Sequence, residues 1–101
     1  MNLHGIDLSD ERLADLCRKW KVKELSLFGS ILRDDFGPDS DVDILVVFFP
    51  EAAWSLWDLF DMREELQQLF GREVDLIEKE ALRNPFRRRE ILQTHRVVYA
   101  A

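Results

Sequence analysis

Residues 42–49 read VDILVVFF, and this stretch decides the fold. Apart from Asp43 it is wholly apolar, and it is rich in the β-branched and aromatic residues that favour strands. A continuous apolar run of this length is typical of a strand that is buried on both faces of a sheet. Pro50 follows directly and ends the strand, because proline has no backbone N–H to donate to a neighbouring strand. We therefore predict a central strand over residues 42–49.

The segments on either side alternate between helical and strand patterns. Residues 29–40 contain two glycines and a proline. This composition predicts a turn that includes at most one or two turns of helix, followed by a loop. The predicted helices run from an N-cap at Ser9 to near Trp20, from an N-cap at Ser55 to a terminal Gly71, and from Asn84-Pro85 to about Thr94; the predicted strands are Glu24–Phe28, Glu73–Ile77 and, at an edge, Val97–Tyr99. This order predicts an α+β fold with a small mixed β-sheet flanked by helices, and a single domain over residues 1–101.

The composition restricts the class of protein. With 47% hydrophobic and 34% charged residues, the chain of 101 residues fits a globular domain better than a disordered or membrane protein. The formal net charge is −6, so we expect no direct nucleic-acid binding, which requires a surplus of basic residues. We also expect no membrane association. The lack of a signal-peptide pattern and the single cysteine, Cys17, predict a cytoplasmic location.

The loop before the central strand carries the residues of chemical interest. Gly29 and Ser30 follow the predicted strand 24–28 directly, and such a pair offers backbone N–H groups and a hydroxyl to a phosphate. Asp41 and Asp43 follow after ten further residues. On a strand, residues two apart point to the same face at a spacing of about 6.6–6.8 Å. Two carboxylates at this spacing can hold a hard cation such as Mg²⁺ between them.

A third acid, Asp75, lies in the middle of the apolar strand 73–77. An unpaired carboxylate is costly to bury, so an aspartate at this position is more readily explained by a functional role than by packing. If this strand neighbours the strand that carries Asp41 and Asp43, the three acids meet at one site. Carboxylates that hold two metal ions about 3.5–4 Å apart suit an in-line displacement at phosphorus.

These residues resemble the signature of the DNA polymerase beta-type nucleotidyltransferase superfamily. The segments GSILRDDFGPDSDVDILVVF (29–48), GREVDLIE (71–78) and NPFRRREILQTHRVVYA (84–100) are similar to those of the minimal nucleotidyltransferase (MNT) domain proteins. Many members of that group are antitoxins encoded beside a HEPN-domain toxin. The resemblance extends from about Leu25 to Tyr99 and includes the whole spacing from Gly29-Ser30 to the aspartates.

The resemblance implies an activity and a role for each residue. It implies that Gly29 and Ser30 hold the phosphates of a nucleotide, and that Asp41 and Asp43 bind two Mg²⁺ ions. It implies that Asp75 binds the catalytic metal and helps to deprotonate the acceptor. The implied reaction is transfer of AMP from ATP to a hydroxyl, for MNT antitoxins a tyrosine of the partner HEPN toxin, with which the chain would form a hetero-oligomer.

Two other functions are compatible with the sequence. A non-catalytic antitoxin would neutralise its toxin by binding and occlusion, although the intact set of three aspartates argues against it. A subunit of a nucleotidyltransferase for small molecules is the weaker alternative, because so short a chain shows no region that would recognise such a substrate. A minimal chain of this kind is expected to take its acceptor site from another protein.

Several side chains outside the three aspartates allow two interpretations. Arg33 either contacts a nucleotide phosphate or pairs with an adjacent aspartate. The basic run Arg87–Arg89 is either a solvated face or a contact for the triphosphate or a partner. In the second helix we expect Trp57 and Phe60 to pack in the core, and we expect Trp54, which precedes the cap at Ser55, to be exposed as a partner contact.

Overall fold

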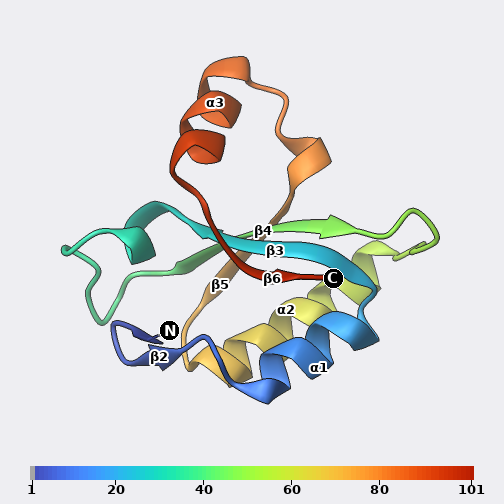
Figure 1. Ribbon diagram of the computed structural model, residues 1–101, viewed down its shortest axis with the longest axis horizontal. Helices are drawn as coiled ribbons and strands as arrows, with labels where there is room; N and C mark the ends of the chain where they lie inside the picture. Colours follow the sequence, from blue (N-terminus) through green and yellow to red (C-terminus); the bar gives the residue numbers. More distant parts are fainter. Residues whose placement is uncertain (1) are drawn as a thin grey trace.

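The computed structural model describes residues 2–101 and arranges them as a sheet with helices on both faces (Figure 1). The main sheet has the strand order β5-β4-β3-β6, so β4 lies inside it, as predicted for the apolar run. In Figure 1, α3 lies above the sheet, and α1 and α2 lie below it. The elements are α1 (Glu11–Lys19), β3 (Val22–Phe28), β4 (Val42–Phe48), α2 (Leu56–Phe70), β5 (Val74–Glu78), α3 (Pro85–Thr94) and β6 (Arg96–Ala100).

The sheet is mixed, and its one parallel pair within residues 2–101 is the pair β4–β5. β3 pairs antiparallel with β4 on one side and with β6 on the other. Parallel neighbours need a long crossover connection, and α2 provides it between β4 and β5. The predicted α+β class with a small mixed sheet is therefore confirmed.

Because side chains alternate along a strand, β4 supplies residues to two cores. Val42, Ile44 and Val46 are buried in the larger core, which lies between the sheet and the helices α1 and α2. On the opposite face Leu45 joins the smaller core under α3, which consists of Phe28, Leu45, Leu82 and Ile91. Asp43 lies two residues before Leu45 and therefore shares the α3 face of the sheet.

Side chains cap the N-termini of α1, α2 and α3, two of them at the predicted residue. Ser55 accepts a hydrogen bond from the Asp58 backbone N–H in a capping box, and Gly71 ends α2 with a positive φ of 67°. Asn84 caps α3, as predicted. The N-cap predicted at Ser9 is wrong, because the Asp10 side chain accepts the bond from the Arg12 backbone N–H. Ser9 instead donates its backbone N–H and its hydroxyl to Asp7.

Several short elements extend the predicted set. A two-stranded hairpin, β1 (Asn2–Leu3) with β2 (Ile6–Asp7), was not predicted. Its turn residue His4 reaches the Ile31 carbonyl, 3.0 Å away, and so braces the next short helix. That helix, η1 (Gly29–Leu32), and η2 (Lys79–Ala81) are both 3₁₀ turns. β3 begins at residue 22 and β6 spans 96–100, so both are longer than the sequence pattern indicated.

The aromatic residues of the α2 region reverse the prediction made for them. Trp57 is 76% exposed and Phe60 is 44% exposed, whereas Trp54 is half-buried. Trp54 packs edge-on against Trp20 and donates its indole N–H to the Trp20 carbonyl at 2.8 Å. α2 turns Met62, Leu66 and Phe70 to the core instead, so its first turns extend beyond the area that the sheet covers.

The structure also shows the environment of the single cysteine and the character of the helices. Cys17 is a free, fully buried cysteine on the core side of α1, and burial raises the pKa of its thiol to about 12. It is therefore a small apolar core residue at neutral pH. Within residues 2–101, no helix combines the length and the apolar character needed to cross a bilayer.

Leucines at the two ends of α2 test the assignment of its buried face. Leu66 is fully buried and Leu56 is 66% exposed. We expect Leu66→Ala to lower the free energy of unfolding by about 2–5 kcal/mol, because it leaves a cavity in the core. Leu56→Ala should change it by no more than about 0.5 kcal/mol. Urea unfolding followed by circular dichroism measures both, and equal losses would contradict the assignment.

Candidate functional site

The parallel pairing of β4 with β5 brings two of the predicted acids together. Asp43 and Asp75 are direct register partners on these adjacent strands. Residues opposite each other in a sheet point to the same face, so both carboxylates lie on the face that α3 covers. The antiparallel partner of Asp43 on its other side is Phe28, the last residue of β3. Asp43 is half-buried between these strands, and Asp75 is exposed.

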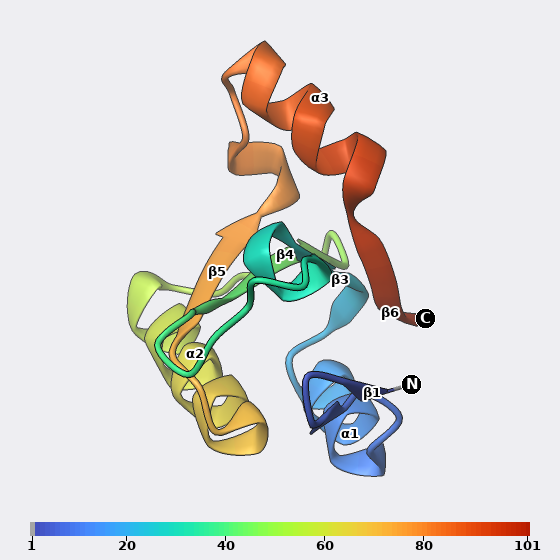
Figure 2. The ribbon, with the colours of Figure 1, turned by 90° about the vertical axis from the view of Figure 1, so that its left-hand side faces the viewer.

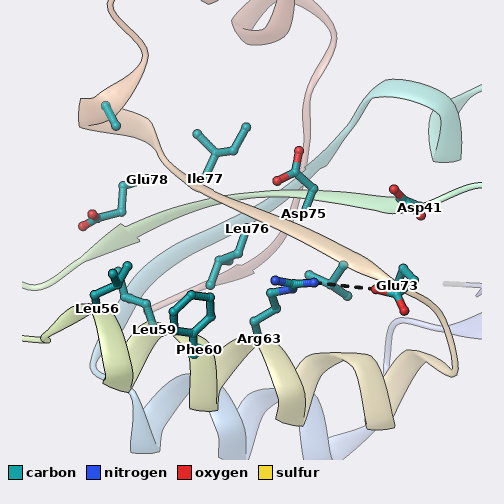
Figure 3. Close-up of a pocket in the computed structure, with 12 residues that line it drawn as sticks. Asp41, Leu56, Leu59, Phe60, Arg63, Glu73, Asp75, Leu76, Ile77 and Glu78 are labelled. Carbon is teal, nitrogen blue, oxygen red and sulfur yellow. Dashed lines mark ion pairs between the residues drawn. The ribbon is translucent and has the colours of Figure 1, made fainter.

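Asp41 precedes β4 by one residue and completes the group. The Val42 backbone N–H donates to the Glu73 carbonyl at 2.8 Å, which holds the start of β4 against the start of β5. Asp41 lies two residues before Asp43 and so points to the same face. Figure 3 shows Asp41 and Asp75 on one side of β5, with Leu76 on the other. The three predicted acids therefore share one end of one face.

Gly29 forms the wall next to Asp43. Its φ is +73°, a conformation that L-residues with a side chain rarely adopt. A Cβ atom at this position would lie 2.4 Å from Oδ2 of Asp43, well inside contact distance. Both the backbone and the carboxylate therefore require glycine here. The residue predicted to approach a phosphate is in contact with the residue predicted to bind a metal.

Ser30 lies within the short helix η1, and Arg33 follows directly after it. The Ser30 hydroxyl is 3.4 Å from the Asp41 carbonyl, so it links the two ends of the loop. Arg33 pairs with Asp35 through Nε at 3.1 Å, and both side chains are largely exposed. Of the two interpretations of Arg33, pairing with an adjacent aspartate is confirmed. Its role toward a nucleotide stays a prediction.

Electrostatic repulsion within the group perturbs Asp43. Burial raises the pKa of Asp43 above its ordinary value, and the nearby charges of Asp75 and Asp41 raise it further. The guanidinium groups of Arg87 and Arg33 lower it, but they do not offset the other effects. The ionised carboxylate at this position is therefore left with uncompensated negative charge.

The donor chemistry of this group fits Mg²⁺. All three side chains offer carboxylate oxygens, the ligands that hard divalent cations prefer. A cation between them would relieve the repulsion that raises the pKa of Asp43. In residues 2–101, no set of three or more acidic, histidine or cysteine side chains is arranged to hold a metal ion as it stands. Asp41 and Asp75 are exposed, and exposed side chains change rotamer within nanoseconds, so both can turn toward Asp43.

Arg72 holds the loop that carries Asp41, a role that the sequence did not reveal. Its Nη1 donates to the carbonyls of Gly37 at 2.6 Å and Ser40 at 3.3 Å. Its guanidinium lies 4.6 Å from the ring centroid of Phe36, which is buried in the larger core. These contacts cross more than 30 residues of sequence, and an arginine after a helix-ending glycine resembles any solvated charge. No local signal could have identified it.

The basic run at the start of α3 divides into different roles. Arg88 donates to the Lys79 carbonyl at 3.0 Å and ties α3 to η2. Arg87 is exposed, and its charge acts on Asp43 across the α3 face. The solvated-face interpretation is therefore too simple for Arg87 and Arg88, and a contact with a triphosphate or a partner stays a prediction.

Sequence comparison relates nearly the whole chain to known proteins. The nucleotidyltransferase domain family matches residues 10–98. The chain is 40% identical over 70 residues to the protein adenylyltransferase MntA of Thermococcus cleftensis, and the match covers 69% of each chain. The region that the family model matches includes every predicted site residue from Gly29 to Asp75.

Structural comparison gives the same fold. A crystal structure of a toxin–antitoxin with AMP-PNP superposes with a TM-score of 0.72, covering 92% of this chain and 74% of that one at 17% identity. A chain from the solved structure of the tri-AMPylated Shewanella oneidensis HEPN toxin in complex with MNT antitoxin superposes with a TM-score of 0.63, covering 90% of this chain and 69% of that one at 16% identity. At these identities the likeness shows the fold alone, and it confirms the predicted nucleotidyltransferase fold.

Two glycines with the same backbone conformation test the contact at Asp43. Gly29 and Gly71 have φ values of +73° and +67°, but a Cβ at Gly71 meets nothing within 4 Å. We expect Gly71→Ala to lower the free energy of unfolding by about 1–2 kcal/mol, the cost of the left-handed conformation. Gly29→Ala should cost more, because its Cβ also displaces the Asp43 carboxylate. Urea unfolding measures both losses, and a smaller loss for Gly29→Ala would contradict the contact.

The raised pKa of Asp43 predicts that this residue destabilises the fold at neutral pH. An acid whose pKa is higher in the folded protein costs stability when ionised, and this cost disappears as the pH falls through the folded pKa to the ordinary value of 3.8. We expect Asp43→Asn to raise the free energy of unfolding at pH 7 in buffer with a chelator, and to lose this gain by pH 3.8. Asp39→Asn, at an exposed loop position, is the control. A destabilised Asp43→Asn variant at pH 7 would refute the repulsion.

Proposed function

The chain belongs to the nucleotidyltransferase domain family, and on this premise we propose that it is a Mg²⁺-dependent protein adenylyltransferase that acts on a HEPN-domain toxin. It transfers AMP from ATP to a tyrosine hydroxyl of that toxin and thereby acts as its antitoxin. The name of the relative MntA supports the reaction class. The solved complexes of a toxin–antitoxin with AMP-PNP and of an AMPylated HEPN toxin with MNT antitoxin support the nucleotide and the partner class.

One observation carries the proposal most directly. Asp43 and Asp75 are paired in register on adjacent parallel strands, with Asp41 next to them on the same face. Gly29, which contacts Asp43, places a backbone without side chain at this point. An array of carboxylates beside a bare backbone is suited to hold cations and the phosphates they accompany.

The reaction exchanges one bond at phosphorus for another. The acceptor oxygen attacks the α-phosphorus of ATP, the bond from that phosphorus to the bridging oxygen breaks, and pyrophosphate leaves. Asp75, on the exposed outer strand, takes the proton of the attacking hydroxyl. Asp41, Asp43 and Asp75 would hold the Mg²⁺ ions, which when bound neutralise charge on the phosphate oxygens.

Gly29 and Ser30 position the nucleotide in this proposal. Gly29 lies against the Asp43 side chain, and the Ser30 hydroxyl lies next to the Asp41 carbonyl. Arg33 and Arg87 carry positive charge close enough to affect Asp43. Both are exposed and can reach phosphate oxygens outside the acidic group. Arg72 acts through the loop, because it fixes the carbonyls of Gly37 and Ser40 just before Asp41.

Substitution of the metal ligands tests the proposal. We expect Asp41→Ala and Asp43→Ala to reduce transfer of label from α-labelled ATP to a purified HEPN-domain protein of the same genome by more than about 100-fold, since even outer partners of a metal site contribute 10–100-fold. Gel autoradiography with Mg²⁺ measures the transfer, and circular dichroism checks the fold. Asp39→Ala, also in the loop, is the matched control and should keep its activity. Unchanged labelling in both test variants would eliminate the site.

The same variants separate catalysis from occlusion. Exposed Leu56, Trp57 and Phe60 give the chain an apolar surface that could cover a partner without chemistry. If the antitoxin acts by AMP transfer, cells that carry the toxin lose protection with Asp43→Ala. Full protection by this variant would favour the non-catalytic antitoxin.

A further inference from the structure

The outer edge of β5 borders a groove that contains part of the proposed transfer site. β5 ends the main sheet on this side, and Figure 2 shows it next to α2 at the margin of the sheet. A groove of about 500 Å³ runs along it, lined by Asp41 and Asp75 together with Leu56, Leu59 and Phe60 of α2. We propose that an extended, hydroxyl-bearing segment of the acceptor protein docks here as an added strand on β5. This inference rests on the proposed function and specifies how the acceptor reaches it.

The α2 wall of the groove is apolar and open to solvent. Leu56 is 66% exposed and Phe60 is 44% exposed, and the neighbouring Trp57 is 76% exposed. Within residues 2–101, these are three of the five large apolar side chains that are clearly exposed. Clustering of this kind on one helix marks a surface that is covered by a partner. Its continuity with Asp75 makes that partner the acceptor.

The backbone of β5 can receive a further strand. In a parallel pair, only alternate residues direct their backbone groups toward the neighbouring strand. The Glu73 carbonyl bonds to Val42 in this way, whereas the Val74 N–H points outward and donates to the Gln67 side chain at 3.2 Å. The backbone groups of Leu76 and Glu78 follow the outward pattern of Val74. Addition of an extended peptide to such an edge is a common mode of recognition.

The alternation of side chains connects this docking mode to the chemistry. On one face of β5 lie Asp75 and Asp41, and on the other lie Leu76 and Phe60 (Figure 3). Successive side chains of an added strand point to opposite faces. A hydroxyl residue directed toward Asp75 therefore places both of its sequence neighbours on the apolar α2 wall. The acceptor segment should carry apolar residues immediately before and after the modified residue.

The charge of the groove adds a second condition. Four acids line it, Asp41, Glu73, Asp75 and Glu78, against a single arginine among the lining residues, Arg63. Arg63 pairs with Glu73 at 3.6 Å, so the remaining acids face the groove without a cation from its lining. Basic residues farther along the segment complement this surface, and acidic residues are repelled by it.

Synthetic peptides test the docking mode without any nucleotide. The probe is a fluorescein-labelled peptide with one tyrosine between two leucines and with lysines outside them, and fluorescence anisotropy measures its binding. We expect Leu56→Ser and Phe60→Ser in the protein, and leucine-to-serine changes in the peptide, each to weaken binding about tenfold, the effect of about 1.4 kcal/mol. Phe86→Ser, an 84% exposed aromatic residue outside the groove lining, is the control and should bind as the wild type does. Equal weakening by the control would overturn the groove assignment.

Backbone methylation distinguishes strand addition from a side-chain contact. We expect N-methyl groups on one alternate set of peptide amides to abolish binding, and on the other set to leave it unchanged, because only one set faces β5. Equal effects of the two sets would overturn strand addition.

Transfer kinetics separate this proposal from the proposed function. With Mg²⁺ and ATP, Leu56→Ser and Phe60→Ser should raise KM for the peptide and leave kcat unchanged. Groove-dependent binding without AMP transfer would uphold the docking site and refute the enzymatic function. AMP transfer with unaltered KM in both variants would uphold the function and refute the docking site.

Discussion

The carboxylates of Asp43 and Asp75 lie side by side because β4 and β5 are parallel and in register. Two negative charges at adjacent sheet positions repel each other, and burial makes the repulsion at Asp43 more costly. The strand sequences around them are apolar, so burial of residues such as Ile44 and Val74 holds the two strands together despite this cost. The fold thus concentrates negative charge at one end of its sheet, and a bound cation would reduce the repulsion between these carboxylates.

The rest of the site is built to keep this end of the sheet in place. Gly29 gives the Asp43 carboxylate room that any side chain would fill. Phe36 anchors the following loop in the larger core, and Arg72 binds two carbonyls of that loop just before Asp41. The loop is long and rich in acidic residues, and these contacts hold it in place at several points. Stability here depends on contacts between segments, with little contribution from the local conformational preference of the loop.

The position of the site at the margin of the sheet has a functional consequence. Asp75 is on the outermost strand, so an acceptor can approach it from the side without entering the fold (Figure 2). α2 extends its first turns beyond the area that the sheet covers, which leaves Leu56 and Phe60 exposed next to that approach. A small domain can thus offer a reaction centre together with a surface for a large substrate.

The sequence by itself determined the features whose signals lie within a few residues: the central strand 42–49, the capping of helices by Ser55 and Asn84, and the shared face of Asp41 and Asp43. It also placed Asp75 on a strand, but only the tertiary structure put that strand in register beside Asp43. The structure likewise decided that Asp10 caps α1 in place of Ser9, since two adjacent residues offer equally good caps. It packed the half-buried Trp54 against Trp20 and left Trp57 exposed, because α2 turns Met62, Leu66 and Phe70 to the core. Arg72 shows the same limit: its partners are more than 30 residues away in the chain, and only folding brings them within hydrogen-bond distance.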